Sequence, residues 1–346
     1  MEKQDPPKFN DGQMPTMADV ARHAGVSSMS VSRALKDGNL VSEATRLRIF
    51  AAIDDLGYVL DLSAGSLSSK RTGFVAAIIP SINNSNFSDT ARGITDALEK
   101  TGLQLLLAYN DYSIEREERL IEAMLRRRPE GIILTGGQHT DRARRMLENA
   151  GIPIVETWDL PAKPIDQVVG FSNAEAMNLL VKSLARKGYQ RFAYIGGTTE
   201  RDTRGNQRRS GFLAAIDELG LPEGRLVSFG VPPISMEQGA QALGNVLDQW
   251  PDTQVVVCVS DLSAFGALME CNRRGLSVPM DIAIAGFGNY EIAAWSHPRI
   301  TSVDIECYEI GKLAAQKLFQ TIQNPNIEGR HELVLTKIRV IEREST

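Results

Sequence analysis

Hydrophobic residues recur at helical spacing from residue 16 to about residue 58, and nothing in this stretch alternates as a strand does. The spacing predicts three short helices, over residues 17–24, 28–35 and 43–56. A tight Ala24-Gly25-Val26 turn separates the first two, an arrangement typical of a helix-turn-helix unit. The third helix is expected to turn inward the side chains of Leu47, Ile49, Phe50, Ile53 and Leu56.

From Gly73 onward, short apolar runs alternate with amphipathic helical stretches. The apolar runs predict strands at residues 74–79, 104–109, 131–135, 153–156, 191–195, 226–229, 254–259 and 281–285. The stretches between them predict helices near residues 88–101, 114–128, 140–150, 173–187, 208–219, 236–249, 262–274 and 307–323. Runs such as VAAII are typical of strands that are buried on both faces of a parallel sheet. Residues 73–346 exceed one usual core, which predicts two α/β subdomains with a cleft between them.

These two patterns divide the chain of 346 residues. Residues 1–14 are polar and contain Pro and Gly, which predicts a disordered tail. Residues 15–60 form the helical unit, residues 61–72 a Ser-rich linker, and residues 73–346 the α/β core. A hydrophobic content of 42% and a charged content of 23% are ordinary for a globular protein.

Charge and cysteine content narrow the function. The net charge of −5 excludes a basic protein that coats nucleic acid, while it leaves a local DNA-reading surface open. Three scattered cysteines without C-x-x-C spacing argue against a disulfide framework and a zinc site, and four dispersed histidines lack metal-ligand spacing. With no secretory signal and no apolar run of about 20 residues, we expect a soluble cytoplasmic protein without a cofactor or metal.

The second helix of a helix-turn-helix unit enters the DNA major groove, where its first residues read base edges. Ser28 and Met29 point outward at the start of this helix, and Arg33 can hold a guanine edge or a phosphate. Five basic and five acidic residues leave the unit neutral, so tight binding needs a dimer or contacts from the linker. A small structural bundle is the alternative. The residues expected to contact DNA are Thr16, Ser27, Ser28, Met29, Ser30, Ser32 and Arg33.

Residues 16–35, TMADVARHAGVSSMSVSRAL, followed by VSEATRLRIFAAIDDLGY, resemble the headpiece of the lactose-repressor (LacI) family. The similarity extends to about residue 340 through ARGITDALEKTG, RPEGIIL, KGYQRFAYIGG, VVVCVSDLSAFGAL and HPRITSV. Within the family, LTGGQHT, VVGFSN and the C-x-R-x-G-L-x-V-P-x-D-x-A-I-A-G-F run most resemble gluconate- and ketogluconate-responsive repressors.

This resemblance implies a homodimeric, ligand-controlled transcriptional regulator that binds a pseudo-palindromic operator and is released by its effector. The fold it implies is a small all-α helix-turn-helix headpiece plus an α/β periplasmic-binding-protein-like core. Three crossovers join the two Rossmann-like subdomains of that core. Their expected bounds are about residues 73–171 with 301–325, and about residues 172–300 with 326–346.

The linker aligns with the hinge helix of the family. Leu67 falls where the family's intercalating leucine lies, a wedge that kinks DNA from the minor groove. Leu60 replaces the proline that usually precedes this helix, and Gly65 lies inside it at a cost of about 1 kcal/mol relative to Ala. We therefore expect a looser hinge than is usual in the family.

The resemblance also places effector-binding residues around the cleft, where strand carboxyl ends meet helix N-termini. Phe87 aligns with an aromatic that flanks effectors, and Trp158 follows a strand in TWDLPAKP, where its ring could stack on a sugar. In GGTTERDTRGNQRRSGF, Arg208 matches the arginine with which most of the family grips its effector; the residues alone leave a solvated charged face open. The expected effector-binding residues are Phe87, Trp158, Arg201, Thr203, Arg208, Ser260, Asp261 and Gly288.

Gly288, in GFGNY, stands where sugar-binding members typically carry an effector-binding Asp. A buried carboxylate would repel an anionic ligand, so its absence, with Arg201 and Arg208 both kept, predicts a sugar acid such as gluconate or ketogluconate. A neutral sugar or a purine is the alternative effector. An enzyme is disfavoured because the chain has no dinucleotide-binding glycine motif, P-loop, nucleophile elbow or H-E-x-x-H pattern. The helix-turn-helix and the missing signal peptide disfavour a transporter's solute-binding protein.

Overall fold

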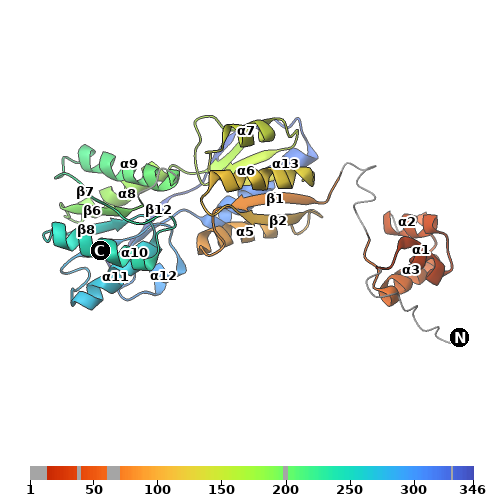
Figure 1. Cartoon of the computed structure of the whole chain (residues 1–346), viewed down its shortest axis with the longest axis horizontal. Coiled ribbons are helices and arrows are strands. Elements are labelled where there is room, and N and C mark those ends of the chain that lie inside the picture. Colours follow the sequence, from red (N-terminus) through yellow and green to blue (C-terminus); the bar gives the residue numbers. More distant parts are fainter. Residues whose placement is uncertain (1–13, 37–39, 61–70, 198–201, 329) are drawn as a thin grey trace. The chain divides into compact units, whose positions relative to one another are not determined.

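The computed structural model describes residues 14–36, 40–60, 71–197, 202–328 and 330–346. The chain folds as two compact units, a headpiece of residues 1–72 and a core of residues 73–346 (Figure 1). The roles expected of Arg201, Gly65 and Leu67 lie outside the described residues. No helix in the described part of the chain is long and apolar enough to span a membrane.

The headpiece has the three predicted helices, α1 (Met17–Ala24), α2 (Ser28–Lys36) and α3 (Glu43–Leu56). Thr16 and Asp19 form a reciprocal capping box at the start of α1, and Gly25 ends this helix in the left-handed conformation at φ 64°. A small core joins the helices through residues that include Val20, Val31 and Ile49. The helix-turn-helix prediction is confirmed.

The inward face predicted for α3 was wrong at two positions. Leu47 is 62% exposed and Phe50 is 42% exposed, whereas Ile49, Ala52 and Leu56 are buried. The two short partner helices cover only one narrow stripe of α3, and positions 47 and 50 lie about 200° and 100° round the helix from Ile49. An apolar residue therefore lies inside the headpiece only when it falls on that stripe.

The first half of the core is a six-stranded parallel sheet in the order β11-β5-β4-β3-β1-β2. Its strands are β1 (Phe74–Ile79), β2 (Gln104–Tyr109), β3 (Ile132–Thr135), β4 (Ile154–Thr157), β5 (Gln167–Gly170) and β11 (Leu333–Leu335). The covering helices are α5 (Ser85–Leu98), α6 (Ile114–Arg126), α7 (Asp141–Glu148) and α13 (Cys307–Gln323). Alternate residues of β1 pack against α5 with α13 and against α6 with α7, so each face of the sheet has its own apolar layer.

The second half is a four-stranded parallel sheet in the order β7-β6-β8-β9. Its strands are β6 (Phe192–Gly196), β7 (Arg225–Ser228), β8 (Val255–Cys258) and β9 (Ala283–Ala285). Its helices are α8 (Asn173–Arg186), α9 (Thr203–Glu218), α10 (Met236–Gln249), α11 (Asp261–Arg274) and α12 (Glu291–Trp295). Helices α8 and α9 cover one face and α10 and α11 the other, which confirms the predicted α/β core of two Rossmann-like halves.

The chain crosses between the halves after β5, after β10 (Ser302–Asp304) and on the way from β11 to β12 (Arg339–Ile341) (Figure 1). Strands β10 and β12 pair antiparallel where two of these passages run together. β11 pairs with β5, so its segment lies with the first sheet and not in the second subdomain, where residues 326–346 were expected. The sequence analysis did not predict β5, β10, β11 and β12, each of which has only three or four residues.

Helices α5 and α13 touch backbone to backbone. A Cβ atom on Gly93 would lie 2.2 Å from the Tyr308 carbonyl oxygen, and one on Gly311 would lie 2.0 Å from the Thr90 carbonyl oxygen. Only glycine allows this approach, because any larger residue would push the helices apart. The contact fixes α5, whose first turn carries residues of the candidate site, to the helix that follows the second crossover.

Candidate functional site

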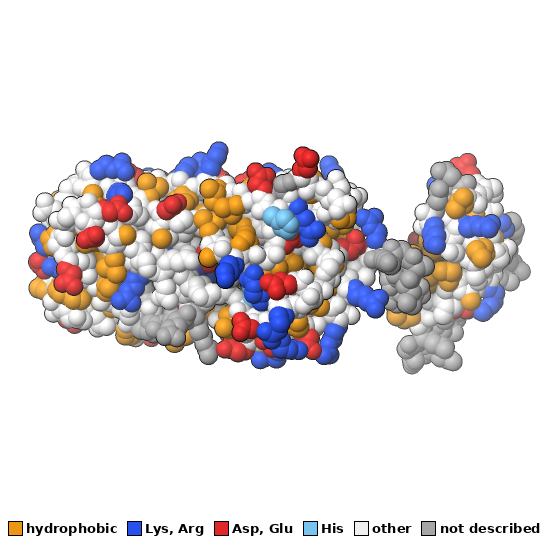
Figure 2. All heavy atoms as spheres, turned by 90° about the horizontal axis from the view of Figure 1, so that it is seen from above, with side chains coloured by type: hydrophobic (Ala, Val, Ile, Leu, Met, Phe, Trp, Pro, Cys, Tyr) orange, Lys and Arg blue, Asp and Glu red, His pale blue; other side chains and the backbone are white. Residues whose placement is uncertain are grey.

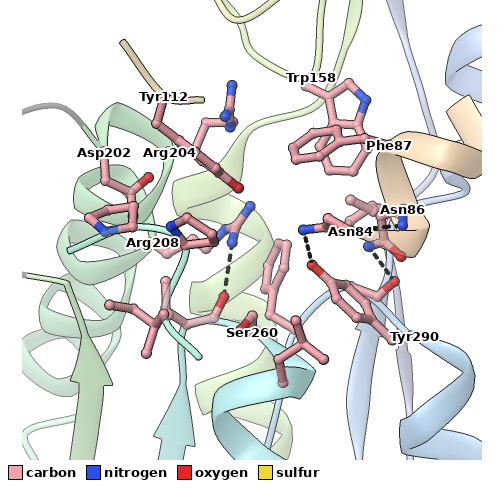
Figure 3. A pocket seen from close by; sticks show the side chains of 18 residues that line it. Asn84, Asn86, Phe87, Tyr112, Trp158, Asp202, Arg204, Arg208, Ser260 and Tyr290 are labelled. Carbon is pink, nitrogen blue, oxygen red and sulfur yellow. Dashed lines mark hydrogen bonds between the residues drawn. The ribbon is translucent and has the colours of Figure 1, made fainter. Parts of the chain in front are cut away.

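A cleft opens between the two halves of the core, where loops at the carboxyl ends of the strands face one another (Figure 3). Its cavity volume is about 60 Å³. The first half contributes the start of α5 and the loops after β2 and β4; the second contributes the start of α9 and the loops after β7, β8 and β9. The lining residues include Asn84, Asn86, Phe87, Tyr112, Trp158, Asp202, Arg204, Arg208, Ser260, Phe287, Gly288 and Tyr290.

An aromatic wall bounds the cleft on the side of the first half. The rings of Phe87 and Trp158 lie 4.7 Å apart between centroids at an angle of 50°. Trp158 Nε1 donates a hydrogen bond to Thr90 Oγ1 at 3.1 Å, so its polar atom is already engaged inside the protein. Both rings are almost fully buried. Trp158 thus lines the cavity as part of a packed wall.

Arg208 extends from α9 across the floor of the cleft. Its Nε donates to Asn173 Oδ1 and its Nη1 to the Val259 carbonyl oxygen, each at 2.9 Å, and its guanidinium lies 3.9 Å from the centroid of the Phe287 ring. Burial lowers the pKa of Arg208, and the nearby carboxylate of Asp202 is the largest charge that opposes this effect.

Arg204 lies one turn earlier on α9 and is 8% exposed. Its guanidinium carbon lies 5.7 Å from the Phe87 ring centroid and 5.9 Å from that of Tyr112, and Nη1 makes a long contact of 3.5 Å with the Thr135 carbonyl oxygen. Burial raises the pKa of Tyr112, and the positive charge of Arg204 is the largest influence that opposes it. Arg204 was not among the residues expected in the site.

The two halves also bond directly across the cleft. Asn84 Nδ2 donates to the Tyr290 hydroxyl at 2.7 Å, and Asn86 Nδ2 donates to the Gly288 carbonyl oxygen at 2.9 Å (Figure 3). Burial raises the pKa of Tyr290, which keeps its hydroxyl neutral and able both to accept and to donate. Gly288 adopts φ 115°, and a Cβ atom there would lie 2.3 Å from Tyr290 Cε1 and 2.5 Å from Asn86 Nδ2.

Five of the expected effector-binding residues line this cleft: Phe87, Trp158, Arg208, Ser260 and Gly288. Thr203, the first residue of α9, is not among its lining residues. Asp261 lies behind the cleft, where its carboxylate accepts hydrogen bonds from Ser302 Oγ at 2.6 Å and from the Tyr290 amide at 2.7 Å. Burial raises the pKa of Asp261 to about 6. This side chain ties α11 to β10 and to the loop before α12.

Several lining residues were not predicted individually. Asn84 and Asn86 fall within residues 81–87, which follow β1 at the edge where a ligand is expected. Tyr290 stands two residues after Gly288, and Arg204 lies in the same basic segment as Arg208, so each had a neighbour as its signal. Tyr112, after β2, had none.

The headpiece presents a second candidate surface at the start of α2. Ser28, Met29 and Arg33 are exposed there, as the groove-reading interpretation requires. The hydroxyls of Ser27 and Ser30 lie 3.0 Å apart, and Thr16 Oγ1 donates to Asp19 Oδ2 at 2.6 Å, so these three side chains also stabilise local turns. On the visible face of the headpiece, basic and hydrophobic side chains lie close together (Figure 2).

A buried polar cluster lies elsewhere in the first half, between α6, β4 and the loop before α7. His139 Nδ1 lies 2.5 Å from Glu117 Oε1, and His139 Nε2 lies 3.4 Å from Glu156 Oε1. Burial disfavours the imidazolium, but its bonds to the two carboxylates outweigh that effect and raise the pKa of His139 to about 9. The ring is therefore charged at neutral pH, and it lies outside the lining of the cleft.

Comparisons with known proteins agree with this architecture. Residues 16–61 match the family described as bacterial regulatory proteins, lacI family, and residues 181–346 match the periplasmic binding protein-like domain. The chain is 34% identical to the HTH-type transcriptional regulator GntR of Escherichia coli K12 over 314 residues, 90% of this chain and 93% of that protein. It is 32% identical to the regulator IdnR of the same strain, over 89% of this chain and 92% of that protein.

Solved structures give the same result. A LacI-family transcriptional regulator from Silicibacter pomeroyi superposes with a TM-score of 0.87 at 33% identity, over 96% of this chain and 99% of the other. The lac repressor dimer bound to operator and an anti-inducer superposes with a TM-score of 0.82 over 96% of this chain and 99% of the other. At 22% identity, that second likeness shows the shared fold.

Proposed function

The chain belongs to the lacI family of bacterial regulatory proteins and is a ligand-responsive, DNA-binding transcriptional regulator; from this premise we propose that its effector is a small sugar acid such as gluconate or ketogluconate. We propose further that it acts as a homodimeric repressor. Two headpieces would read the half-sites of a pseudo-palindromic operator, and effector binding would release them.

The observation that carries the sugar-acid proposal is the charge of the cleft. Among the described residues, Arg204 and Arg208 line it together with a single acidic side chain, Asp202. Asp202 Oδ1 already accepts the Gly205 amide at 2.9 Å as the N-cap of α9. Two cations and the N-terminus of a 16-residue helix thus outweigh one engaged carboxylate. A pocket of this sign, in a region of low dielectric, attracts a carboxylate.

The rest of the lining suits the polyol part of such a ligand. The Asn84 and Asn86 amides and the Tyr290 and Ser260 hydroxyls offer hydrogen bonds, and the Phe87 ring offers an apolar face. A cavity of about 60 Å³ favours a compact effector over an oligosaccharide, since a water molecule needs roughly 10–15 Å³ on the same scale.

A binding experiment tests the effector class. Melting of the purified protein is followed with gluconate, 2-ketogluconate, 5-ketogluconate, neutral hexoses and purines. A ligand at about 100 times its Kd should stabilise the native state by about 2.7 kcal/mol. A shift with a sugar acid alone supports the proposal. A shift with neutral hexoses or purines alone contradicts the effector and leaves the regulator intact.

DNA recognition has its own test. Duplexes that the protein selects from a random DNA library should be enriched in a pseudo-palindrome, because a two-fold dimer reads two half-sites. Arg33→Ala should weaken binding to the selected site by about tenfold or more. Arg22→Ala is the matched control on α1, because that exposed side chain pairs with Asp19 at 2.8 Å. Enrichment of an asymmetric sequence, or equal losses in both variants, would contradict this part of the proposal.

A further inference from the structure

The two arginines of the cleft differ in how far the protein already satisfies them. Arg208 uses Nε and Nη1 on Asn173 and on the Val259 carbonyl, and its face is stacked on Phe287. The nearby carboxylate of Asp202 also opposes the lowering of the pKa of Arg208, so it stabilises the charged guanidinium. These contacts fix Arg208 in place and partly compensate its charge. Among the hydrogen bonds of the described residues none uses Nη2, which can turn toward a ligand.

Arg204 is held differently. Among the residues that the structure describes, no carboxylate lies within 4 Å of its guanidinium, and its Nη1 makes a long hydrogen bond of 3.5 Å to the Thr135 carbonyl oxygen. Two aromatic rings, Phe87 and Tyr112, border it, and the side chain is more than nine-tenths buried. A buried cation in such surroundings is costly unless an anion joins it.

The backbone at the end of β3 lets the guanidinium of Arg204 come close. Gly136 lies at φ 105°, and a Cβ atom there would stand 3.1 Å from Arg204 Nη1. With glycine at this position, Nη1 lies against the end of β3, while Arg204 remains among the residues that line the cleft. The planar fork of an arginine can hold both oxygens of a carboxylate through two parallel N–H···O bonds.

We propose that Arg204, and not Arg208, supplies the positive charge that binds the carboxylate of the effector. Arg208 is then a positioning residue that joins α8, α9 and the end of β8, and it contacts the hydroxyl-bearing part of the ligand. This division of roles rests on the sugar-acid function proposed above. It places the carboxylate beside the Phe87 and Tyr112 rings and directs the polyol chain toward Asn84 and Ser260.

The test compares one ligand with and without its charge. Gluconate and gluconamide have the same polyol chain and differ in whether the end group is a carboxylate or an amide. Isothermal titration of the wild-type protein should show tighter binding of gluconate. Arg204→Gln should weaken gluconate by about tenfold to a hundredfold and leave gluconamide within about threefold of wild type, so that the preference for charge disappears.

Two further variants separate charge from folding. Arg209→Gln removes the same charge from the next turn of α9, outside the cleft lining, and should leave both affinities unchanged. Arg204→Lys keeps the charge but loses the fork, and should retain part of the preference for gluconate. Melting without ligand identifies any variant that does not fold, and Arg204→Lys then takes the place of Arg204→Gln in the comparison.

The outcomes distinguish this inference from the function on which it rests. If the wild type binds gluconate more tightly than gluconamide and Arg204→Gln keeps that preference, the role given to Arg204 is overturned and the sugar-acid effector stands. If Arg208→Gln abolishes the preference and Arg204→Gln does not, the two roles are reversed. If the wild type binds no sugar acid, the proposed effector class falls and this inference falls with it.

Discussion

Asn84 and Tyr290, 206 positions apart in the chain, are joined by a hydrogen bond of 2.7 Å across the cleft. Asn84 caps α5 in the first half of the core, and Tyr290 precedes α12 in the second half. The bond exists only while the two halves are close together. It therefore stabilises the closed cleft and contributes no free energy to an open one.

Tyr290→Phe should weaken effector binding. The substitution leaves the buried Asn84 amide without an acceptor, which costs about 1–3 kcal/mol in the closed form. We expect the Kd of the effector to rise by about fivefold or more, while the open form is unaffected. Titration calorimetry measures the change. Tyr189→Phe, at a half-buried tyrosine outside the cleft lining, is the control; an equal effect in both variants would argue against the cross-cleft bond.

Gly288→Ala should destabilise the core for a steric reason. The new methyl group would meet the Tyr290 ring and the Asn86 amide, at a φ that L-residues rarely adopt. Gly275→Ala is the matched control, because Gly275 also has a positive φ, of 72°, but no atom of the described residues lies within 4 Å of the added Cβ. The control should lose about 1–2 kcal/mol of unfolding free energy and Gly288→Ala at least about 1 kcal/mol more.

Urea unfolding followed by tryptophan fluorescence checks this, because all three tryptophans lie in the core unit. Equal losses at the two glycines would show that the neighbouring side chains give way. Position 288 thus has a steric reason for glycine besides the electrostatic one, that a buried carboxylate would repel an anionic ligand. The Cβ atom of an Asp at this position would clash with Tyr290 and Asn86, whatever the charge of the side chain.

The buried His139 predicts a dependence of stability on pH. Its folded pKa is raised to about 9, whereas the unfolded chain releases the same proton near pH 6.5. The folded state binds more protons between these values, so its stability is fully present below about pH 6.5 and falls as pH rises through 9. The loss should be on the order of 2–3 kcal/mol.

Unfolding free energies measured from pH 6 to pH 9.5 test this expectation. Glu117→Gln removes one of the two carboxylates and should flatten the decline. His331→Gln is the control, because that side chain is 73% exposed. A decline of unchanged size in Glu117→Gln would show that other groups cause it.

Trp295 predicts the position of a subunit contact. It ends α12 with 82% of its surface exposed, which is unusual for so large an apolar side chain. In the proposed homodimer, Trp295→Ser should weaken this contact and shift the protein toward monomer. Leu213→Ser, on the exposed side of α9, should not. Light scattering at micromolar concentration measures the shift. A dimer that is equally stable in both variants would place the interface elsewhere.

The sequence predicted the long elements and missed four of the short strands. The strand at 74–79 and the helix at 236–249 were found at their observed bounds, because the first is an unbroken apolar run and the second is long enough to show a helical period. A run of three residues such as β11 owes its strand conformation to β5, a partner 163 or more positions away along the chain. No local pattern can contain that information.

The candidate site divides in the same way. Arg208 and Phe87 were predicted because each falls in a recognisable family pattern, in the first two turns of a helix that follows a strand. Asn84 became part of the cleft through its bond to Tyr290, and Arg204 through its burial between two rings, and both depend on the folded arrangement. Leu47 and Phe50 show the converse, since their apolar character alone did not place them inside.

The three passages of chain between the halves of the core make the connection redundant. A protease that cuts one of them leaves two covalent links and the β10–β12 pairing intact. Limited digestion should therefore yield fragments that separate on a denaturing gel yet migrate as one particle in a native one. Genetic dissection meets the same constraint: neither half is a contiguous stretch of sequence, so a single truncation point cannot release either of them whole.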